Sequence, residues 1–238
     1  MKKGNYENEH DRNLANFDVL IAKLINLGSN YKPIRTAIHI SALKIISQNA
    51  KSALNNVTEL QTRYDLVFKE RERFFVQQAY LMGKIKAYIL QCSAMTELEL
   101  YLVSGCRKMP LHKLEKNLRH DYLLKNWSKL LHLIKVLTYY NPPSADMEIA
   151  YLEDFYKDWY TKHQELKSVE AYLRQAYTIR EEIFYRNRYG LVAIAAIVRT
   201  YIKYQFGWNS AIYKSVISLP IKNTHWEKQE SSKVAEIL

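Results

Sequence analysis

Arg107 and His112 come closest, among the residues of this sequence, to a catalytic motif. Some helical ribonucleases carry an arginine followed, after a few residues, by a histidine. A chain with this content of arginine and histidine has about one such pair by chance. Pro110 also lies between the two residues, and proline disfavours a continuous helix that presents both side chains. We therefore expect neither a helical ribonuclease nor any other enzyme.

Metal and thiol chemistry have equally little support. A di-iron helical bundle needs Glu-x-x-His on two helices and two further glutamates, whereas this sequence has the motif once, at Glu7 and His10. Cys92 and Cys106 are too few for a disulfide framework or a four-thiolate zinc site, and we expect both to be buried free cysteines. The sequence thus predicts no metal and no cofactor.

The most suggestive feature is the segment 183–226, which contains six lysines and arginines and no acidic residue. Aromatic residues are interleaved with these cations. Cations can hold phosphates while nucleic-acid bases stack on rings, so the segment could bind nucleic acid. A second basic segment, 107–135, has eight lysines and arginines against two acids. The candidate anion or nucleic-acid surface comprises Arg186, Arg188, Arg199, Tyr201, Lys203 and Trp208.

The same residues also fit simple packing. In that interpretation Tyr201 and Trp208 belong to the core at one end of a helical bundle, and the cations form a solvated face. We expect this alternative to hold, because no known nucleic-acid-binding motif supports the first. With a net charge of +11, an acidic protein and an anionic membrane surface are further alternatives as partners.

Apolar residues recur every three or four positions along two long segments, about residues 43–74 and 152–183. Such spacing forms an apolar seam on one side of a helix. Leu60 and Leu166 lie in the middle of the seams, where we expect them to be buried. Arg71 and Arg180 interrupt the seams at corresponding positions. We expect each guanidinium to reach water or a neighbouring glutamate, the alternative being a paired anion site.

Each half of the sequence follows the same plan of a short, a long and a medium helix. The expected fold is therefore all-α: an elongated bundle of two tandem three-helix repeats, with two long antiparallel coiled-coil-like helices. The expected boundaries are a disordered N-terminus 1–10, repeat 1 at 11–103, a basic connector 104–122, repeat 2 at 123–207 and a C-terminal tail 208–238.

The end of the second repeat resembles a known group of proteins. The segment begins with Gly190-Leu191-Val192, continues through Tyr201-Ile202-Lys203 and ends at Phe206-Gly207. It is similar to the last helix of two-repeat α-helical proteins from Bacteroidetes, which have no established activity. The resemblance covers most of the chain, apart from the tail from Asn223 to Leu238, and implies the same helical fold without implying catalytic residues.

The sequence shows no signal peptide, and its longest apolar run, residues 191–198, is far shorter than the roughly 20 residues of a membrane-spanning helix. We therefore expect a cytoplasmic, non-enzymatic interaction or scaffold protein that binds a protein partner or associates with itself. The alternative is a nucleic-acid-binding protein that uses segment 183–226.

Overall fold

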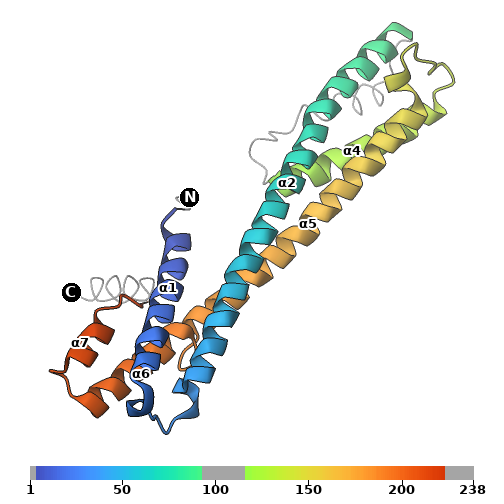
Figure 1. Ribbon diagram of the computed structural model, residues 1–238. Coiled ribbons are helices and arrows are strands. Elements are labelled where there is room, and N and C mark those ends of the chain that lie inside the picture. The colour runs from blue at the N-terminus through green and yellow to red at the C-terminus, as the bar shows by residue number, and fades with distance from the viewer. Residues whose placement is uncertain (1–3, 93–115, 223–238) are drawn as a thin grey trace, which may run out of the picture. The chain divides into compact units, whose positions relative to one another are not determined.

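The computed structural model describes residues 4–92 and 116–222 (Figure 1). These residues form six α-helices and no strand, which confirms the predicted all-α helical bundle. The helices are α1 (Gly4–Asn26), α2 (Ile40–Cys92), α4 (Lys116–Val136), α5 (Ile149–Tyr185), α6 (Leu191–Phe206) and α7 (Ala211–Ile217). Three short 3-10 turns, η1 (Gly28–Asn30), η2 (Thr36–Ile38) and η4 (Ala145–Met147), lie in the loops before the long helices. No helix in the described ranges is long and apolar enough to cross a membrane.

The chain divides into two compact units. Unit 1 combines residues 1–61 with residues 172–238, and unit 2 consists of residues 62–171. The long helices α2 and α5 each contribute one end to unit 1 and the other end to unit 2. Each compact unit therefore contains parts of both expected sequence repeats.

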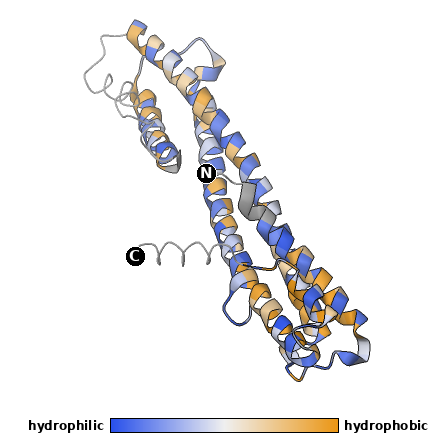
Figure 2. Cartoon of the chain, turned by 90° about the vertical axis from the view of Figure 1, so that its left-hand side faces the viewer, coloured by the Kyte–Doolittle hydropathy of each residue, from blue (hydrophilic) through white to orange (hydrophobic). Residues whose placement is uncertain are grey.

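Unit 1 has its core between α1, the first half of α2, the end of α5 and α6. The helices are amphipathic, with hydrophobic and hydrophilic residues on different sides (Figure 2). Phe17 and Leu20 of α1, Phe184 of α5 and Val198 and Ile202 of α6 are all fully buried. Removing these apolar surfaces from water is the main stabilising contribution to this unit.

Unit 2 packs α4 against the second half of α2 and the first half of α5. Its core contains two fully buried tryptophans, Trp127 of α4 and Trp159 of α5. The two long helices run antiparallel in this unit, because residues later in α2 contact residues earlier in α5. The contacts join Arg63 to Glu165 at 3.5 Å, Glu70 to Lys162 at 2.9 Å and Gln77 to Tyr151 at 3.0 Å.

The expected three-helix plan differs from the structure in the first half of the chain. As far as Cys92, where the description of this part ends, the long and medium helices expected there form one continuous helix, α2, and Gly83 lies inside it without ending it. In the second half, α5 and α6 are separate helices joined by residues 186–190. Arg188 there has a left-handed φ of 68°, and a Cβ on Gly190 would approach the Arg186 nitrogen to 2.6 Å. Only glycine fits so close an approach.

Further expectations on boundaries and burial also need correction. Helix α1 begins at Gly4 rather than at residue 11, and His10 in the expected disordered segment is buried. The expected tail contains α7. Leu166 is fully buried, whereas Leu60 is only half-buried. Cys92 is exposed at the end of α2 rather than buried. Of the expected connector 104–122, residues 116–122 are the start of helix α4, and residues 104–115, which include Cys106, Arg107 and His112, lie outside the described residues.

Candidate functional site

The loop between α1 and α2 forms one wall of an open pocket in unit 1, and Tyr31 fixes the conformation of this loop. The buried Tyr31 hydroxyl donates a hydrogen bond of 2.6 Å to the carbonyl oxygen of Ile38. Its ring meets the ring of Tyr201 on α6 edge-on, with centroids 5.3 Å apart. The Tyr201 hydroxyl in turn accepts a hydrogen bond of 3.2 Å from the backbone nitrogen of Lys32. These contacts join the loop to α6.

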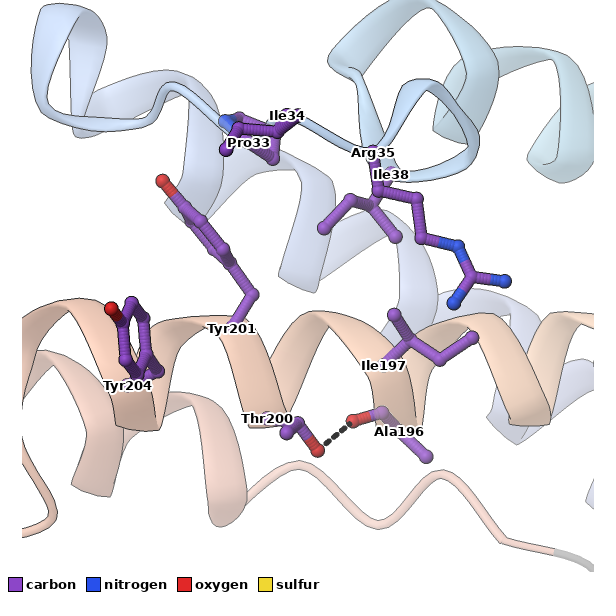
Figure 3. A pocket seen from close by; sticks show the side chains of 9 residues that line it. All are labelled: Pro33, Ile34, Arg35, Ile38, Ala196, Ile197, Thr200, Tyr201 and Tyr204. Atoms are coloured by element: carbon purple, nitrogen blue, oxygen red, sulfur yellow. Dashed lines mark hydrogen bonds between the residues drawn. The ribbon is translucent and has the colours of Figure 1, made fainter.

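The pocket has a volume of about 630 Å³ and is mainly apolar. Figure 3 shows the loop residues on one side and the α6 residues on the other, with Arg35 extending from the loop on the Ile197 side. The lining residues are Pro33, Ile34, Arg35, Ile38, Ala196, Ile197, Thr200, Tyr201 and Tyr204. The Ile34 side chain is 100% exposed and Tyr204 is 86% exposed. Pockets of this size and composition are typical of binding sites.

Both walls of the pocket come from segments without acidic residues. The α6 wall belongs to the basic segment 183–226, and the loop wall belongs to residues 19–58, which contain five lysines and arginines and no aspartate or glutamate. Arg35 is exposed, and no carboxylate among the described residues pairs with it. The charged side chain of the lining is thus a cation, and neither segment that forms a wall contains an acidic residue, an arrangement that favours negatively charged ligands.

Arg199, a half-buried residue of the expected anion surface, makes hydrogen bonds within the protein. The Arg199 guanidinium donates hydrogen bonds to the carbonyl oxygens of Leu219 and Ile221 (3.3 Å to Ile221). Asn13 of α1 binds Lys222, which follows Ile221. The Asn13 side-chain amide accepts a hydrogen bond of 3.2 Å from the Lys222 backbone nitrogen and donates one of 2.9 Å to the Lys222 carbonyl oxygen. Arg199 thus anchors the segment after α7, while Lys203 on the same helix is exposed to solvent.

This difference predicts unequal effects of two substitutions on α6 on the free energy of unfolding. Arg199→Gln is expected to lower the free energy of unfolding by about 1–2 kcal/mol, because charge-assisted hydrogen bonds to two carbonyls are lost. Lys203→Gln, at an exposed site, is expected to change it by less than about 0.5 kcal/mol. Urea unfolding of both variants measures the difference, and equal stabilities would contradict the anchoring role of Arg199.

The other predicted surface residues lie at different places in unit 1. Arg186 and Arg188 are exposed in the turn between α5 and α6, and the Arg186 guanidinium lies 5.8 Å from the centre of the Tyr189 ring. Trp208 is 68% exposed, so its expected core position is wrong. Tyr201 is half-buried and packs against the core, as the packing interpretation predicts. Of the six predicted residues, Tyr201 lines the pocket.

Arg71, a seam arginine, lies in a buried polar cluster of unit 2. Its side chain is fully buried, and its guanidinium is 3.0 Å from Glu72. The same Glu72 oxygen is 3.0 Å from Nε2 of the buried His120 on α4. Trp159 donates a hydrogen bond of 3.1 Å to Nδ1 of His120. Because Nδ1 accepts a hydrogen bond, neutral His120 carries its proton on Nε2 and donates it to Glu72.

Burial and the nearby Arg71 charge lower the pKa of His120 to about 4. A second histidine, His163 of α5, stacks on His120 with ring centroids 5.7 Å apart, and its Nε2 lies 2.8 Å from Asp121. Burial also lowers the pKa of His163. Lys167 lies 2.8 Å from the same Asp121 carboxylate. No three ligand-type residues in the described part of the chain are grouped so that they could hold a metal ion.

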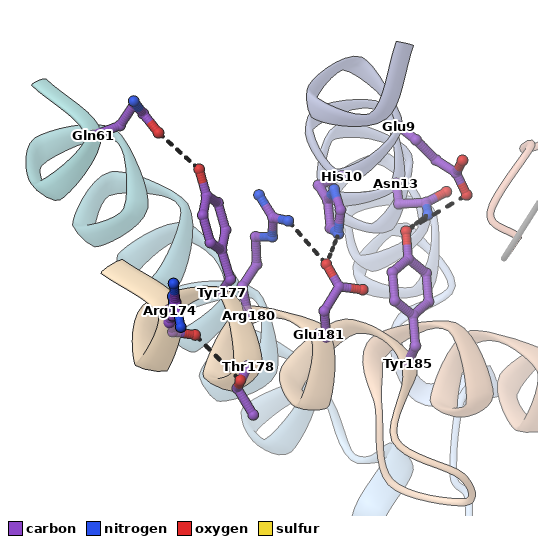
Figure 4. A network of polar contacts seen from close by, with 10 residues as sticks. All are labelled: Glu9, His10, Asn13, Gln61, Arg174, Tyr177, Thr178, Arg180, Glu181 and Tyr185. Carbon is purple, nitrogen blue, oxygen red and sulfur yellow. Dashed lines mark hydrogen bonds and ion pairs between the residues drawn. The ribbon is translucent and has the colours of Figure 1, made fainter. Parts of the chain in front are cut away.

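Arg180 forms a corresponding cluster in unit 1 (Figure 4). Its guanidinium lies 2.9 Å from Glu181, and the same Glu181 oxygen lies 3.1 Å from Nε2 of the buried His10 on α1. In both clusters the arginine also lies over an aromatic ring three residues earlier, Phe68 for Arg71 and Tyr177 for Arg180. Each seam arginine thus pairs with the following glutamate, in agreement with the expectation of a neighbouring carboxylate. The two clusters belong to different units.

A second, smaller pocket lies in unit 2, with a volume of about 390 Å³. Its lining residues are Glu70, Arg73, Phe74, Gln77 and Lys162. Lys162 is already paired there with Glu70 at 2.9 Å and with Glu165 at 3.1 Å. The mutual neutralisation of these charges makes this pocket a weaker candidate than the apolar pocket of unit 1.

Comparisons of the chain with protein-family models, curated proteins and solved structures give no match. The resemblance to helical proteins of Bacteroidetes stays a prediction. Function is therefore inferred from the geometry of the chain itself.

The pocket was not among the sites predicted from the sequence. One signal was available, namely the second acid-free segment, 19–58, which has almost the length of the first. The sequence contains no comparable indication of the partners of the three buried histidines. His10 pairs with a residue 171 positions away, and His120 and His163 pair with residues 48 and 42 positions away.

Proposed function

We propose that this chain is a cytoplasmic, non-enzymatic interaction protein that binds its partner at the apolar pocket of unit 1. The observation that carries the proposal is the exposure of Ile34 and Tyr204 at the opening of an apolar pocket. A large aliphatic side chain that is entirely exposed beside an apolar pocket marks a surface suited to binding.

The groups that line the pocket favour binding over catalysis. The Thr200 hydroxyl donates a hydrogen bond of 3.0 Å to the carbonyl oxygen of Ala196, and the Tyr201 hydroxyl is bonded to the Lys32 nitrogen. Arg35 is the one charged residue of the lining. Nucleophilic catalysis needs a nucleophile in contact with a base, and the lining offers no such pair.

The test compares proteins that co-purify with the wild type and with Ile34→Asp from the native host at physiological salt. Because Ile34 is fully exposed, the variant is expected to keep the wild-type melting temperature and to lose the pocket-bound partner. Ile45→Asp is the matched control, since Ile45 is also exposed (61%) in unit 1 but does not line the pocket. A partner that is retained by Ile34→Asp, or lost equally from both variants, would count against the proposal.

Nucleic-acid binding is the second candidate, and the exposure of Trp208, Tyr189, Arg186 and Arg188 favours it. If this function holds, affinity for single-stranded RNA falls steeply with salt, with each neutralised phosphate adding roughly −0.7 to the log–log slope. An Arg186→Ala/Arg188→Ala double variant would flatten that slope by about one unit or more. Filter binding at two salt concentrations, and the ratio of absorbance at 260 and 280 nm of the purified protein, decide whether this candidate holds.

A further inference from the structure

The loop that lines the pocket has a counterpart in unit 2. In unit 2, the Tyr140 hydroxyl donates a hydrogen bond of 2.8 Å to the carbonyl oxygen of Met147, as Tyr31 does to Ile38. The ring of Tyr140 meets the ring of Tyr88 edge-on at 5.5 Å, and the Tyr88 hydroxyl accepts a hydrogen bond of 3.1 Å from the nitrogen of Asn141. Residues 140–147 and 31–38 are therefore held against their neighbouring helices in the same way.

The two loops differ in the charged groups next to this shared framework. In unit 2, Lys84 lies one helical turn before Tyr88 and reaches the loop, with its Nζ 2.7 Å from both carboxylate oxygens of Asp146 and 3.1 Å from the Ser144 hydroxyl. An ion pair thus joins the helix to the loop at that place.

In unit 1 the carboxylate of this arrangement is missing. Ile197 lies one turn before Tyr201, at the position that corresponds to Lys84, and Ala37 is at the loop position that corresponds to Asp146. The cation of unit 1 is instead on the loop, because Arg35 is at the position of Ser144. Unit 1 therefore has an apolar helix face and an arginine without a carboxylate in the described residues, where unit 2 has a complete ion pair.

We infer that the pocket of unit 1 binds an acidic segment of a partner protein, which places apolar side chains on Ile34 and Ile197 and a carboxylate on Arg35. This inference rests on the proposed function and names the chemistry of the partner. An arginine can hold a carboxylate with two parallel hydrogen bonds, which gives orientation as well as affinity. The basic, acid-free walls favour a negatively charged segment over a neutral or basic one.

The shape of the site favours a peptide segment as its occupant. Ile34 and Tyr204 lie at an open rim and are almost fully exposed. A ligand that covers both of them and also contacts Arg35 must extend along the rim, as a helix or an extended segment with several side chains does.

The experiment measures binding of short fluorescent peptides to the full chain by anisotropy. One peptide has leucines interleaved with aspartate and glutamate, and its matched peptide has lysine in place of every acid. We expect the acidic peptide to bind at least tenfold more tightly than the basic one, and this preference to shrink as salt rises. Arg35→Gln is expected to weaken the acidic peptide about tenfold, as for the loss of one charge-assisted interaction.

Arg12→Gln is the control for charge, since Arg12 is an exposed arginine of unit 1 that does not line the pocket. It should leave the affinity close to that of the wild type, and Arg35→Glu should reverse the preference in favour of the basic peptide. Arg35 is exposed, so thermal melts of these variants should match that of the wild type.

Different negative results would overturn the acidic partner and the binding function of the pocket. If both peptides bind equally and Ile34→Asp weakens both, the pocket is a binding surface and the acidic partner is wrong. If the protein dimerises in sedimentation and Ile34→Asp prevents this, a second copy is the occupant and the inference is also wrong. If neither peptide binds and Ile34→Asp loses no co-purified partner, the proposed function itself fails.

Discussion

Replacing Glu72 with alanine is expected to lower the free energy of unfolding by about 3–5 kcal/mol. The Arg71 side chain is fully buried, and the variant removes a carboxylate 3.0 Å from its guanidinium. Removing a carboxylate from an ion pair with a buried charge is strongly destabilising, because the interaction is made where the guanidinium is shielded from solvent. The same change removes the acceptor of the His120 Nε2–H group. Guanidinium-induced unfolding followed by circular dichroism measures the loss.

Glu70→Ala provides the matched control on the same helix. Glu70 also forms an ion pair, with Lys162 at 2.9 Å, but both side chains are partly exposed. Surface pairs contribute about 0–1 kcal/mol, so this variant should be close to the wild type. An Arg71→Met/Glu72→Gln double variant should recover much of the lost stability, because it removes the buried charge together with its partner. Equal losses from Glu70→Ala and Glu72→Ala would show that burial of Arg71 does not govern the effect.

Unit 2 is expected to lose stability in mild acid, between about pH 6.5 and pH 4. The pKa of His120 is about 4 in the folded protein, first because of its burial and then because of Arg71, and near 6.5 in an unfolded chain. The unfolded chain therefore takes up a proton in this interval that the folded protein does not bind. Stability falls as the pH falls, by about 3 kcal/mol in total for this group, and the contribution is fully present above pH 6.5.

The hydrogen bonds of His120 give a further reason why the folded protein resists protonation of this histidine. A proton on Nδ1 of His120 would meet the N–H group of Trp159, which already donates to that atom. Among the described residues, Arg71 and Glu72 on α2 and His163 on α5 interact with the His120 ring, and Asp121 on α4 pairs with His163 and with Lys167. Burial opposes ionisation of Glu72 and Asp121, but the hydrogen bonds from His120 and Arg71 to Glu72 and from Lys167 and His163 to Asp121 lower both pKa values overall, so both carboxylates add a further loss of stability at lower pH.

His120→Gln is the variant that isolates the histidine. A glutamine amide does not titrate, yet it can accept from Trp159 and donate to Glu72. Its unfolding free energy should therefore vary less between pH 6.5 and pH 4 than that of the wild type. Urea unfolding at several pH values, followed by tryptophan fluorescence, checks this result. A variant with the same pH dependence as the wild type would rule out His120 as the main titrating group.

The helical class and the long helices could be predicted from the sequence, because apolar spacing and the scarcity of glycine and proline act locally. The pairing of each seam arginine with a neighbouring glutamate was equally accessible, since both residues lie on the same helix. Helix ends were harder to predict. Gly83 lies inside α2, whereas Gly190 follows a turn that no helix can continue through, and the difference depends on what surrounds each backbone.

The candidate site could not be predicted in the same way, because its two walls lie far apart in the sequence. Tyr31 and Tyr201 meet only through tertiary packing. The basic segment around Arg199 was recognised, but its most central arginine turned out to hold backbone carbonyls. Composition identifies a charged segment, and only the fold separates a cation that faces solvent from one that is already bonded.

The division of the chain has a consequence for its synthesis on the ribosome. Unit 2 is a continuous segment, whereas unit 1 needs residues 1–61 together with residues from 172 onward. Translation proceeds at roughly 5–20 residues per second, so α6 is synthesised about ten seconds or longer after α1. During that time the apolar face of α1, with Phe17 and Leu20, lacks the helix that buries it. Unit 2 is therefore expected to fold first, and the N-terminal helix is the segment most in need of chaperone protection during translation.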